Sequence, residues 1–412
     1  MNAGQNGRTV QALDVARALA GTGHQATLRE LLALLARGDA EAARTWHVLL
    51  HGGLLPLLAH VADERGLLAD APAPLRDSLR SALEVNTIRN AVLRRVATDA
   101  TRTLSAHGVP SLWAKGLWLA HRVYPHPGLR TMADIDLIVP LGMRAQARQA
   151  LETAGFALDG TMPQEGAAEW TDTLSRNAPL PQGDAVAQLD LHDALRTSAV
   201  HLWPVRRLWE RAQPFRQAGP TALAPSAEAG FLYLAAHLYK HGFDLRHTLV
   251  AIVDAAAVLQ AAGDTLDVEW MLTELDDTRD VVAVYLLLAL VGASPSEAGR
   301  RLQQQVGDRM SAAGLTSSAD RLLESVRHLS LITASDFSLF EVGEQRSLLT
   351  VAGHLLAGIV RWRRRTGGTP GAVAGGGALS RLTRGATWRY AYTSFLAGRL
   401  HARSAGVTAG RD

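Results

Sequence analysis

Two carboxylates head an apolar, β-branched segment, Asp134-Ile135-Asp136-Leu137-Ile138-Val139. Such residues are typical of a β-strand, in which Asp is unfavourable. Residues i and i+2 of a strand point to the same face, roughly 6.6 Å apart. Asp134 and Asp136 would therefore repel each other unless a cation lies between them. Because a pair of divalent metal ions about 3.5–4 Å apart fits such a clamp, the segment predicts a site for metal-dependent phosphoryl or nucleotidyl transfer.

The surrounding sequence predicts an α/β unit between two helical regions. Strand candidates at 109–113, 156–158 and 186–192 alternate with helical segments at 115–124 and 144–154. Apolar residues recur at helical spacing before and after this unit. We therefore expect an α+β fold, mostly helical overall, with a small mixed β-sheet core flanked by N-terminal and C-terminal helical regions. The expected units are 1–107 (helical), 108–215 (α/β core), 216–365 (helical) and 366–412 (Gly-rich linker and basic tail).

Composition narrows the classes of site and of partner. The chain of 412 residues has no Cys, which excludes disulfides, thiolate zinc sites and a Cys nucleophile. With no leader and no apolar run of 18 residues, we expect no membrane span and a cytoplasmic location. The formal charge of +3 hides a basic tail, since residues 361–412 hold ten Arg and one acid. Nucleic acid is a conceivable partner of this tail, but a solvated extension is the favoured interpretation.

Lysine is almost absent, because only Lys115 and Lys240 occur among 42 basic residues. A composition that replaces Lys with Arg wherever Arg serves suggests that these two lie where a compact ammonium is needed. Lys115 precedes Gly116 between a strand and a helix, where backbone N–H groups can approach a phosphate. The spacing is not that of a Walker A loop. A surface lysine at a turn is the alternative for Lys115.

Three further residues near the carboxylates are candidates for the same site. Asp190 interrupts an apolar strand as Asp134 does, so we expect it to be a third metal ligand or the base that accepts the nucleophile's proton. His192 shares its strand face and would orient an acceptor or a nucleotide, unless it is a buried structural histidine. Arg130 would hold phosphate oxygens in a bidentate fork or tether an Asp.

A helical group follows later in the chain, where His237, Lys240 and His241 share one helix face at positions i, i+3 and i+4. The Glu of a zinc-protease H-E-x-x-H motif is missing. We therefore favour contacts to a nucleotide or an acceptor over zinc, with a structural polar network as the alternative. Asp254 on the next helix is a candidate partner for Lys240 or a histidine.

These elements resemble the signature of the uncharacterised bacterial nucleotidyltransferase family within the DNA polymerase β-like superfamily. The resemblance covers about residues 25 to 265 and rests on Lys115-Gly116, Tyr124, Pro127-Gly128-Leu129-Arg130, Met132 to Val139, Asp190-Leu191-His192, His237 to His241, Asp254 and His51-Gly52 with Leu54 to Leu58. It implies a nucleotidyltransferase core at 108–215 that uses Mg²⁺ or Mn²⁺ with ATP or another NTP. Better known superfamily members have a Gly-Ser pair where Lys115-Gly116 stands. Members of the family often accompany natural-product gene sets, which implies a peptide or small-molecule acceptor.

The resulting hypothesis is a bacterial, metal-dependent transferase that moves NMP, in the first instance AMP, from an NTP to such an acceptor in natural-product biosynthesis. The expected catalytic and metal-binding residues are Asp134, Asp136 and Asp190. The expected nucleotide-binding residues are Lys115, Gly116, Arg130, His192, Lys240 and His241. The alternatives are a phosphotransferase that moves the γ-phosphate of ATP and a catalytically weak binding or adaptor protein.

Overall fold

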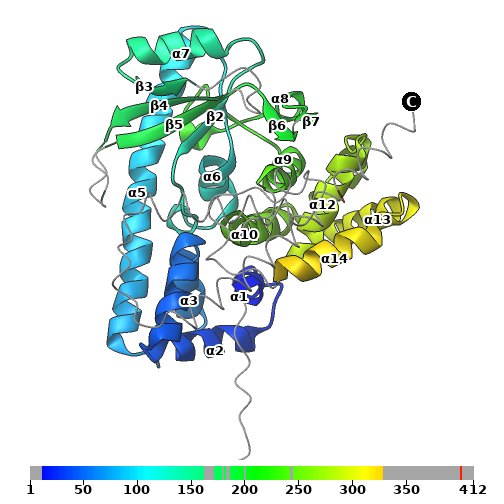
Figure 1. Ribbon diagram of the computed structural model, residues 1–412. Helices are drawn as coiled ribbons and strands as arrows, with labels where there is room; N and C mark the ends of the chain where they lie inside the picture. Colours follow the sequence, from blue (N-terminus) through cyan, green and yellow to red (C-terminus); the bar gives the residue numbers. More distant parts are fainter. Residues whose placement is uncertain are drawn as a thin grey trace, which may run out of the picture.

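The computed structural model describes residues 12–161, 171–178, 181, 186–198, 201–241, 245–327 and 400. Apart from Leu400, the linker and basic tail expected at 366–412 lie outside the described residues. The described chain is mostly helical around a seven-stranded mixed sheet, which confirms the predicted fold class. In Figure 1 the sheet lies at the top, α2 and α3 at the bottom, and α9 and α10 in the centre.

Among the described residues, five helices precede the sheet: α1 Ala12–Leu19, α2 Gln25–Ala36, α3 Ala40–His51, α4 Leu55–Glu64 and α5 Ala73–Ala106. The longest, α5, runs along one side of the molecule from the other N-terminal helices to the sheet (Figure 1). Two asparagines interrupt its buried face, and their amides hold the loop that leads to the carboxylates. Asn86 Nδ2 donates to the carbonyl of Gly128 at 2.6 Å. Asn90 Nδ2 donates to the carbonyls of Pro127 at 2.6 Å and Arg130 at 2.7 Å.

The sheet has the strand order β3-β4-β5-β2-β1-β9-β8. Its strands are β1 Leu112–Trp113, β2 Ile135–Ile138, β3 Ala157–Thr161, β4 Thr171–Asn177, β5 Val186–His192, β8 Gln213–Pro214 and β9 Leu223–Ala224, and β6 Leu195–Ser198 pairs separately with β7 His201–Trp203. The central strands β2 and β5 are parallel, with Asp136 beside Asp190 and Ile138 beside His192. Residues in register on neighbouring strands share a face. The register therefore brings together two carboxylates that are 54 positions apart in sequence.

The predicted strand at 134–140 is shorter in the structure, since β2 begins at Ile135. Asp134 therefore lies in the segment before the strand. The prediction that Asp134 and Asp136 lie on one strand is wrong for Asp134. The predicted helix at 115–124 is divided into α6 Lys115–Trp118 and a π-helical turn, η1 Leu119–Val123. Asp136 itself is 4% exposed, within the core of the sheet.

The remaining helices surround the sheet and build the second helical region. They are α7 Arg144–Thr153, α8 Arg206–Glu210, α9 Ala227–Lys240, α10 Leu245–Ala262, α11 Val268–Thr273, α12 Thr278–Val291, α13 Glu297–Ala312 and α14 Thr316–Arg327, with 3₁₀ turns η2 Pro127–Leu129, η3 Arg216–Ala218 and η4 Gly263–Thr265. In the described part of the chain, one helical stretch is long and apolar enough to cross a membrane, Arg246–Thr265, and 56% of it is buried inside the protein. That burial is typical of a core helix.

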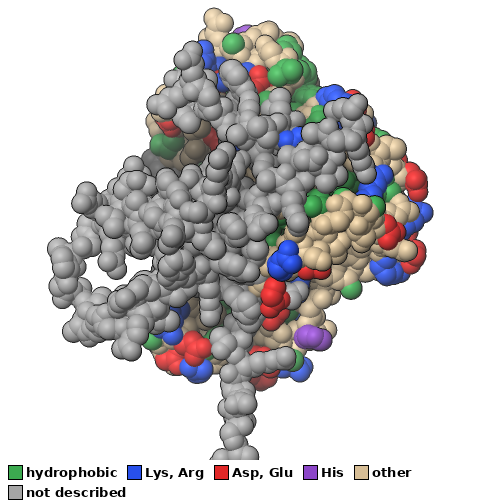
Figure 2. Space-filling view, turned by 45° about the vertical axis from the view of Figure 1, so that its right-hand side comes forward, with side chains coloured by type: hydrophobic (Ala, Val, Ile, Leu, Met, Phe, Trp, Pro, Cys, Tyr) green, Lys and Arg blue, Asp and Glu red, His purple; other side chains and the backbone are tan. Residues whose placement is uncertain are grey.

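The described surface on the side of α12 to α14 is mixed in charge. On the part of this face that Figure 2 shows in colour, basic and acidic side chains are interspersed. Interspersed charges of both signs are typical of a solvated surface.

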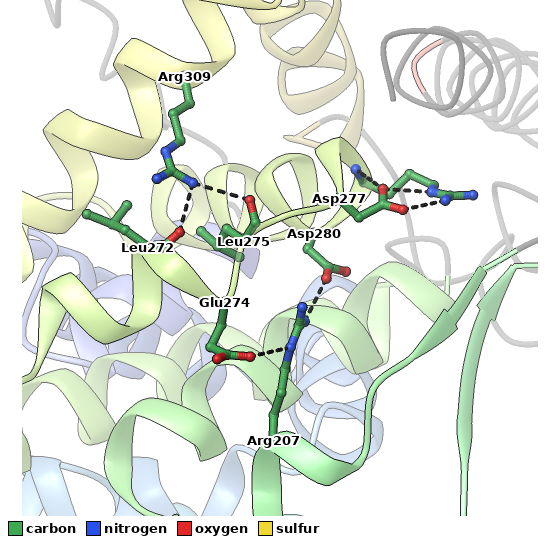
Figure 3. A network of polar contacts seen from close by, with 8 residues as sticks. Arg207, Leu272, Glu274, Leu275, Asp277, Asp280 and Arg309 are labelled. Carbon is green, nitrogen blue, oxygen red and sulfur yellow. Dashed lines mark hydrogen bonds and ion pairs between the residues drawn. The ribbon is translucent and has the colours of Figure 1, made fainter. Parts of the chain in front are cut away.

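A buried ion-pair network joins the short helix α8 to the end of α11 and the first turn of α12 (Figure 3). Arg207 Nε donates to Glu274 Oε2 at 2.9 Å, and its Nη1 donates to Asp280 Oδ2 at 2.7 Å. Arg207 is 2% exposed, so water screens the charges poorly. Nearby, Arg309 donates to the carbonyl of Leu272 at 2.9 Å. The network fixes α8, which lies between β7 and β8 in the chain, to the C-terminal helices.

We predict that Arg207→Met lowers the free energy of unfolding by about 3–5 kcal/mol, because it leaves two carboxylates without their buried cation. The adjacent Arg206→Met is the matched control. The Arg206 side chain is 62% exposed and pairs with Glu210 on the same helix, so its loss should cost less than about 0.5 kcal/mol. Urea unfolding of both variants measures the difference, and equal costs would contradict the assignment.

Candidate active site

A cavity of about 570 Å³ lies where β2, β5 and α6 face α3, α5, α9 and α10. Every residue that the sequence nominated for the site lines it: Lys115, Gly116, Arg130, Asp134, Asp136, Asp190, His192, Lys240 and His241. Both lysines of the chain are therefore in one cavity. Residues that the motifs did not nominate also line it, namely Asn86, Arg89, Arg246 and His247. Of these four residues, only Asn86 stands out in the sequence, because it is a polar residue on an apolar helix face.

The Asp136 carboxylate has two nitrogen atoms close to one of its oxygens. Lys115 Nζ donates to its Oδ1 at 2.7 Å, and His192 Nε2 lies 3.0 Å from the same oxygen. Burial alone would raise the pKa of Asp136, but attraction to the Lys115 ammonium and the hydrogen bond with His192 hold it well below its ordinary value. Burial would lower the pKa of Lys115, but Asp136 raises it above its ordinary value. Both partners are therefore charged at neutral pH.

The turn after β1 aims Lys115 at this carboxylate. Lys115 has φ 44° and is the non-glycine residue with positive φ among the described residues, a left-handed conformation that costs a side-chain-bearing residue about 1–2 kcal/mol. Gly116 follows in tight surroundings, since a Cβ there would lie 2.6 Å from Met132 Cγ. Backbone strain of this kind is concentrated at functional sites. The strained turn holds the ammonium against the neighbouring strand.

Asp136, Asp190 and His192 form a group whose potential ligand atoms all lie within 4.8 Å of one another. Thr173 Oγ1 donates to Asp190 Oδ1 at 2.8 Å and orients that carboxylate. Carboxylate oxygens are the donors that Mg²⁺ and Mn²⁺ prefer, and the imidazole nitrogen extends the set toward transition metals. The side chains present therefore fit a divalent ion. The sequence predicted Asp134, Asp136 and Asp190 as the metal ligands. In the structure, His192 and not Asp134 completes the group with Asp136 and Asp190.

Asp134 lies beside this group in the cavity lining. Burial, with repulsion from Asp136 and a smaller contribution from Asp190, raises the pKa of its carboxyl to about 6, although Lys115 opposes the shift. Burial is the largest cause of this shift, and repulsion between neighbouring carboxylates adds to it. A divalent cation beside these carboxylates would offset that repulsion.

Arg130 is anchored by a buried acid on α10. Its Nη2 donates to Asp254 Oδ2 at 2.9 Å and its Nε lies 3.2 Å from both oxygens. Tyr124 donates to Asp254 Oδ1 at 2.9 Å. The sequence suggested Lys240 or a histidine as the partner of Asp254, and the structure gives it Arg130 and Tyr124. Of the two roles considered for Arg130, the tether is therefore observed, and phosphate binding stays a prediction.

Three histidines form a stacked cluster on the helical side of the cavity. His237 Nε2 and His241 Nε2 are 3.2 Å apart, and the His241 ring stacks on His247 with centroids 3.7 Å apart. Burial, with smaller contributions from His247, Lys240 and Lys115, lowers the pKa of His241 to about 2. The His237 pKa is well below its ordinary value, mainly through burial and then Lys115. These two imidazoles are neutral at neutral pH, so lysine and arginine supply the positive charge here.

A close approach of two helices sets α9 against the lysine turn. Gly230 on α9 contacts Trp118 at the end of α6, and a Cβ at Gly230 would lie 2.1 Å from Trp118 Cη2. Because His237 and Lys240 lie further along α9, this contact sets their distance from Lys115. The absence of a side chain at Gly230 therefore helps to set the shape of the cavity.

Sheet, cavity and ligand group together form a candidate transferase site that could hold a divalent ion. A family model described as an uncharacterised nucleotidyltransferase matches residues 38–293. The match spans more than half of the chain, so the protein belongs to this nucleotidyltransferase family, as the resemblance indicated. The matched residues include all nine nominated site residues. No curated protein and no solved structure matches the chain.

We predict that Gly230→Ala lowers the free energy of unfolding by about 1–3 kcal/mol, because the added methyl group overlaps a rigid indole ring. Gly307→Ala on α13 is the control, since a Cβ there meets nothing within 4 Å. Without a clash, Gly→Ala inside a helix stabilises by about 0.5–1 kcal/mol. Thermal and urea unfolding compare the two variants, and equal effects would argue against close α6–α9 packing.

Proposed function

We propose that this protein transfers NMP, in the first instance AMP from ATP, to a peptide or small-molecule acceptor in natural-product biosynthesis. The observation that carries the proposal is the co-location, in one cavity, of a carboxylate group suited to a divalent ion and a set of cations suited to phosphates. Family membership supports nucleotidyl transfer in general. The choice of nucleotide and the kind of acceptor are proposed in addition to what family membership supports.

The charges of the cavity suit a metal–triphosphate complex. Two ion pairs, Lys115 with Asp136 and Arg130 with Asp254, balance internally. Beyond these pairs the lining holds three cations and two carboxylates: Arg89, Lys240, Arg246, Asp134 and Asp190. The carboxylates attract divalent ions, and the cations attract the phosphate oxygens that accompany them. A substrate that carries both kinds of charge complements this lining better than a simple anion or cation does.

The residues divide into roles that follow from their contacts. Asp136, Asp190 and His192 would hold the ion, with Asp134 beside them. The ion would neutralise charge on the transferring phosphate and on the pyrophosphate that leaves. Lys115 and the backbone at Gly116 would bind phosphate oxygens, and Lys240 would bind them from α9. His241 would donate to or accept from the nucleotide or the acceptor as a neutral imidazole.

The position of the isotope label in the NTP tests which part of the nucleotide is transferred. The protein is incubated with Mg²⁺, α-labelled or γ-labelled NTP, and the peptides and small molecules made by neighbouring genes. Label from the α position in the acceptor, with release of pyrophosphate, is the expected result. Label from the γ position with release of ADP would instead identify a phosphotransferase. If calorimetry detects no Mg²⁺-dependent NTP binding, a binding or adaptor role replaces both.

We predict that Asp190→Asn lowers the transfer rate by about 100-fold or more, because it removes a metal-binding carboxylate. Loss of a residue that only supports a metal ligand already costs up to about 100-fold in activity. Stability should change by less than about 1 kcal/mol, because the Asp190 side chain is half-buried and its hydroxyl partner can bond an amide equally well. Asp159→Asn on the exposed β3 strand is the control and should transfer at the wild-type rate. Near-normal transfer by Asp190→Asn would contradict the assigned site.

A further inference from the structure

The chain's own ammonium competes for the carboxylate that a divalent ion would use. Lys115 Nζ lies 2.7 Å from Asp136 Oδ1, and Asp136 is a member of the three-residue ligand group. His192, another member, lies 3.0 Å from the same oxygen. A carboxylate oxygen has two lone pairs, and here two nitrogen atoms approach them. An ion that binds Asp136 through this oxygen must displace one of these nitrogens.

Burial makes the competition strong. The side chains of Lys115 and Asp136 are 14% and 5% exposed, so water screens an ammonium and a neighbouring divalent ion poorly. Repulsion between cations a few ångströms apart grows as the local dielectric falls.

The cavity offers a displaced ammonium few places to go. Asp254 already accepts hydrogen bonds from Arg130 and Tyr124, and Asp190 belongs to the ligand group. The α9 side presents another cation, Lys240, and the imidazoles of His237 and His241. Neutral imidazoles do not replace the carboxylate as a counter-ion. Apart from Asp134, which lies beside the ligand group, the described lining has no further carboxylate. The triphosphate of an incoming nucleotide supplies an additional anion.

We propose that Lys115 holds the place of the divalent ion at Asp136 and passes to the triphosphate when a metal–NTP complex enters. The site then binds the ion together with the nucleotide and binds the free ion weakly. This inference rests on the proposed function, because it takes the metal–NTP complex as the substrate. It adds a coupling between the two ligands that depends on one named side chain.

The test measures Mn²⁺ affinity without nucleotide, by electron paramagnetic resonance of the free ion, in the full-length protein at pH 8. Lys115→Met should bind Mn²⁺ about tenfold or more tightly than the wild type, within the usual range of coupling between ligands. Lys115→Gln, which keeps a hydrogen-bond donor without the charge, should shift in the same direction. This second variant serves if the methionine variant does not fold.

Three controls separate competition from a general loss of positive charge. Lys240→Met removes the other ammonium of the same cavity and should raise the Mn²⁺ affinity far less than Lys115→Met does. Lys115→Arg keeps the charge and should bind Mn²⁺ as weakly as the wild type. Asp136→Asn should abolish the tight binding gained in Lys115→Met, which locates the ion.

A second measurement follows the nucleotide. In the wild type, α,β-methylene ATP should raise the affinity for Mn²⁺ beyond what the affinity of Mn²⁺ for the nucleotide itself explains, and in Lys115→Met this excess should fall about tenfold. Mn²⁺ affinity in Lys115→Met and Lys115→Gln equal to or weaker than that of the wild type overturns the inference and leaves the proposed function intact. Absence of Mn²⁺ binding in every protein, with or without nucleotide, overturns both.

Discussion

The parallel pairing of β2 with β5 is the constraint on which the site depends. It puts Asp136 and Asp190 side by side on one face of the sheet, and burial makes that arrangement costly unless positive charge lies between them. Lys115 supplies part of this charge from the turn that follows β1. The strained backbone at Lys115 and the crowded Gly116 are consequences of the same requirement, because the turn must deliver an ammonium to one carboxylate oxygen.

The helical regions complete the cavity rather than merely surrounding the sheet. Asn86 and Asn90 of α5 hold the loop before β2 through its carbonyls. Arg130 ties the same loop to Asp254 on α10. Gly230 lets α9 approach the lysine turn. Each contact joins segments that are distant in sequence, so the positions of the cations relative to the carboxylates depend on the fold of all three parts.

The sequence predicts the acidic half of the site better than the basic half. Asp136 and Asp190 interrupt apolar strands, and that local conflict is visible without a structure. Arg89 and Arg246 lie on helices where an arginine conflicts with nothing, so no local signal distinguishes them from solvated residues. The Arg130–Asp254 pair spans 124 positions, and nothing in the spacing specifies it. Fold class followed from periodicity, whereas β8 and β9, of two residues each, are too short to show a period.

The scarcity of lysine acquires a physical explanation in the cavity. The chain uses Arg at nearly every basic position, yet both of its lysines line this one site. A guanidinium bonds best to two acceptor oxygens in a fork, as Arg130 does with Asp254. Lys115 instead makes a short contact with a single oxygen that His192 also approaches. A compact ammonium on a flexible stem fits that shared position, and the same stem can carry it from a carboxylate to a phosphate.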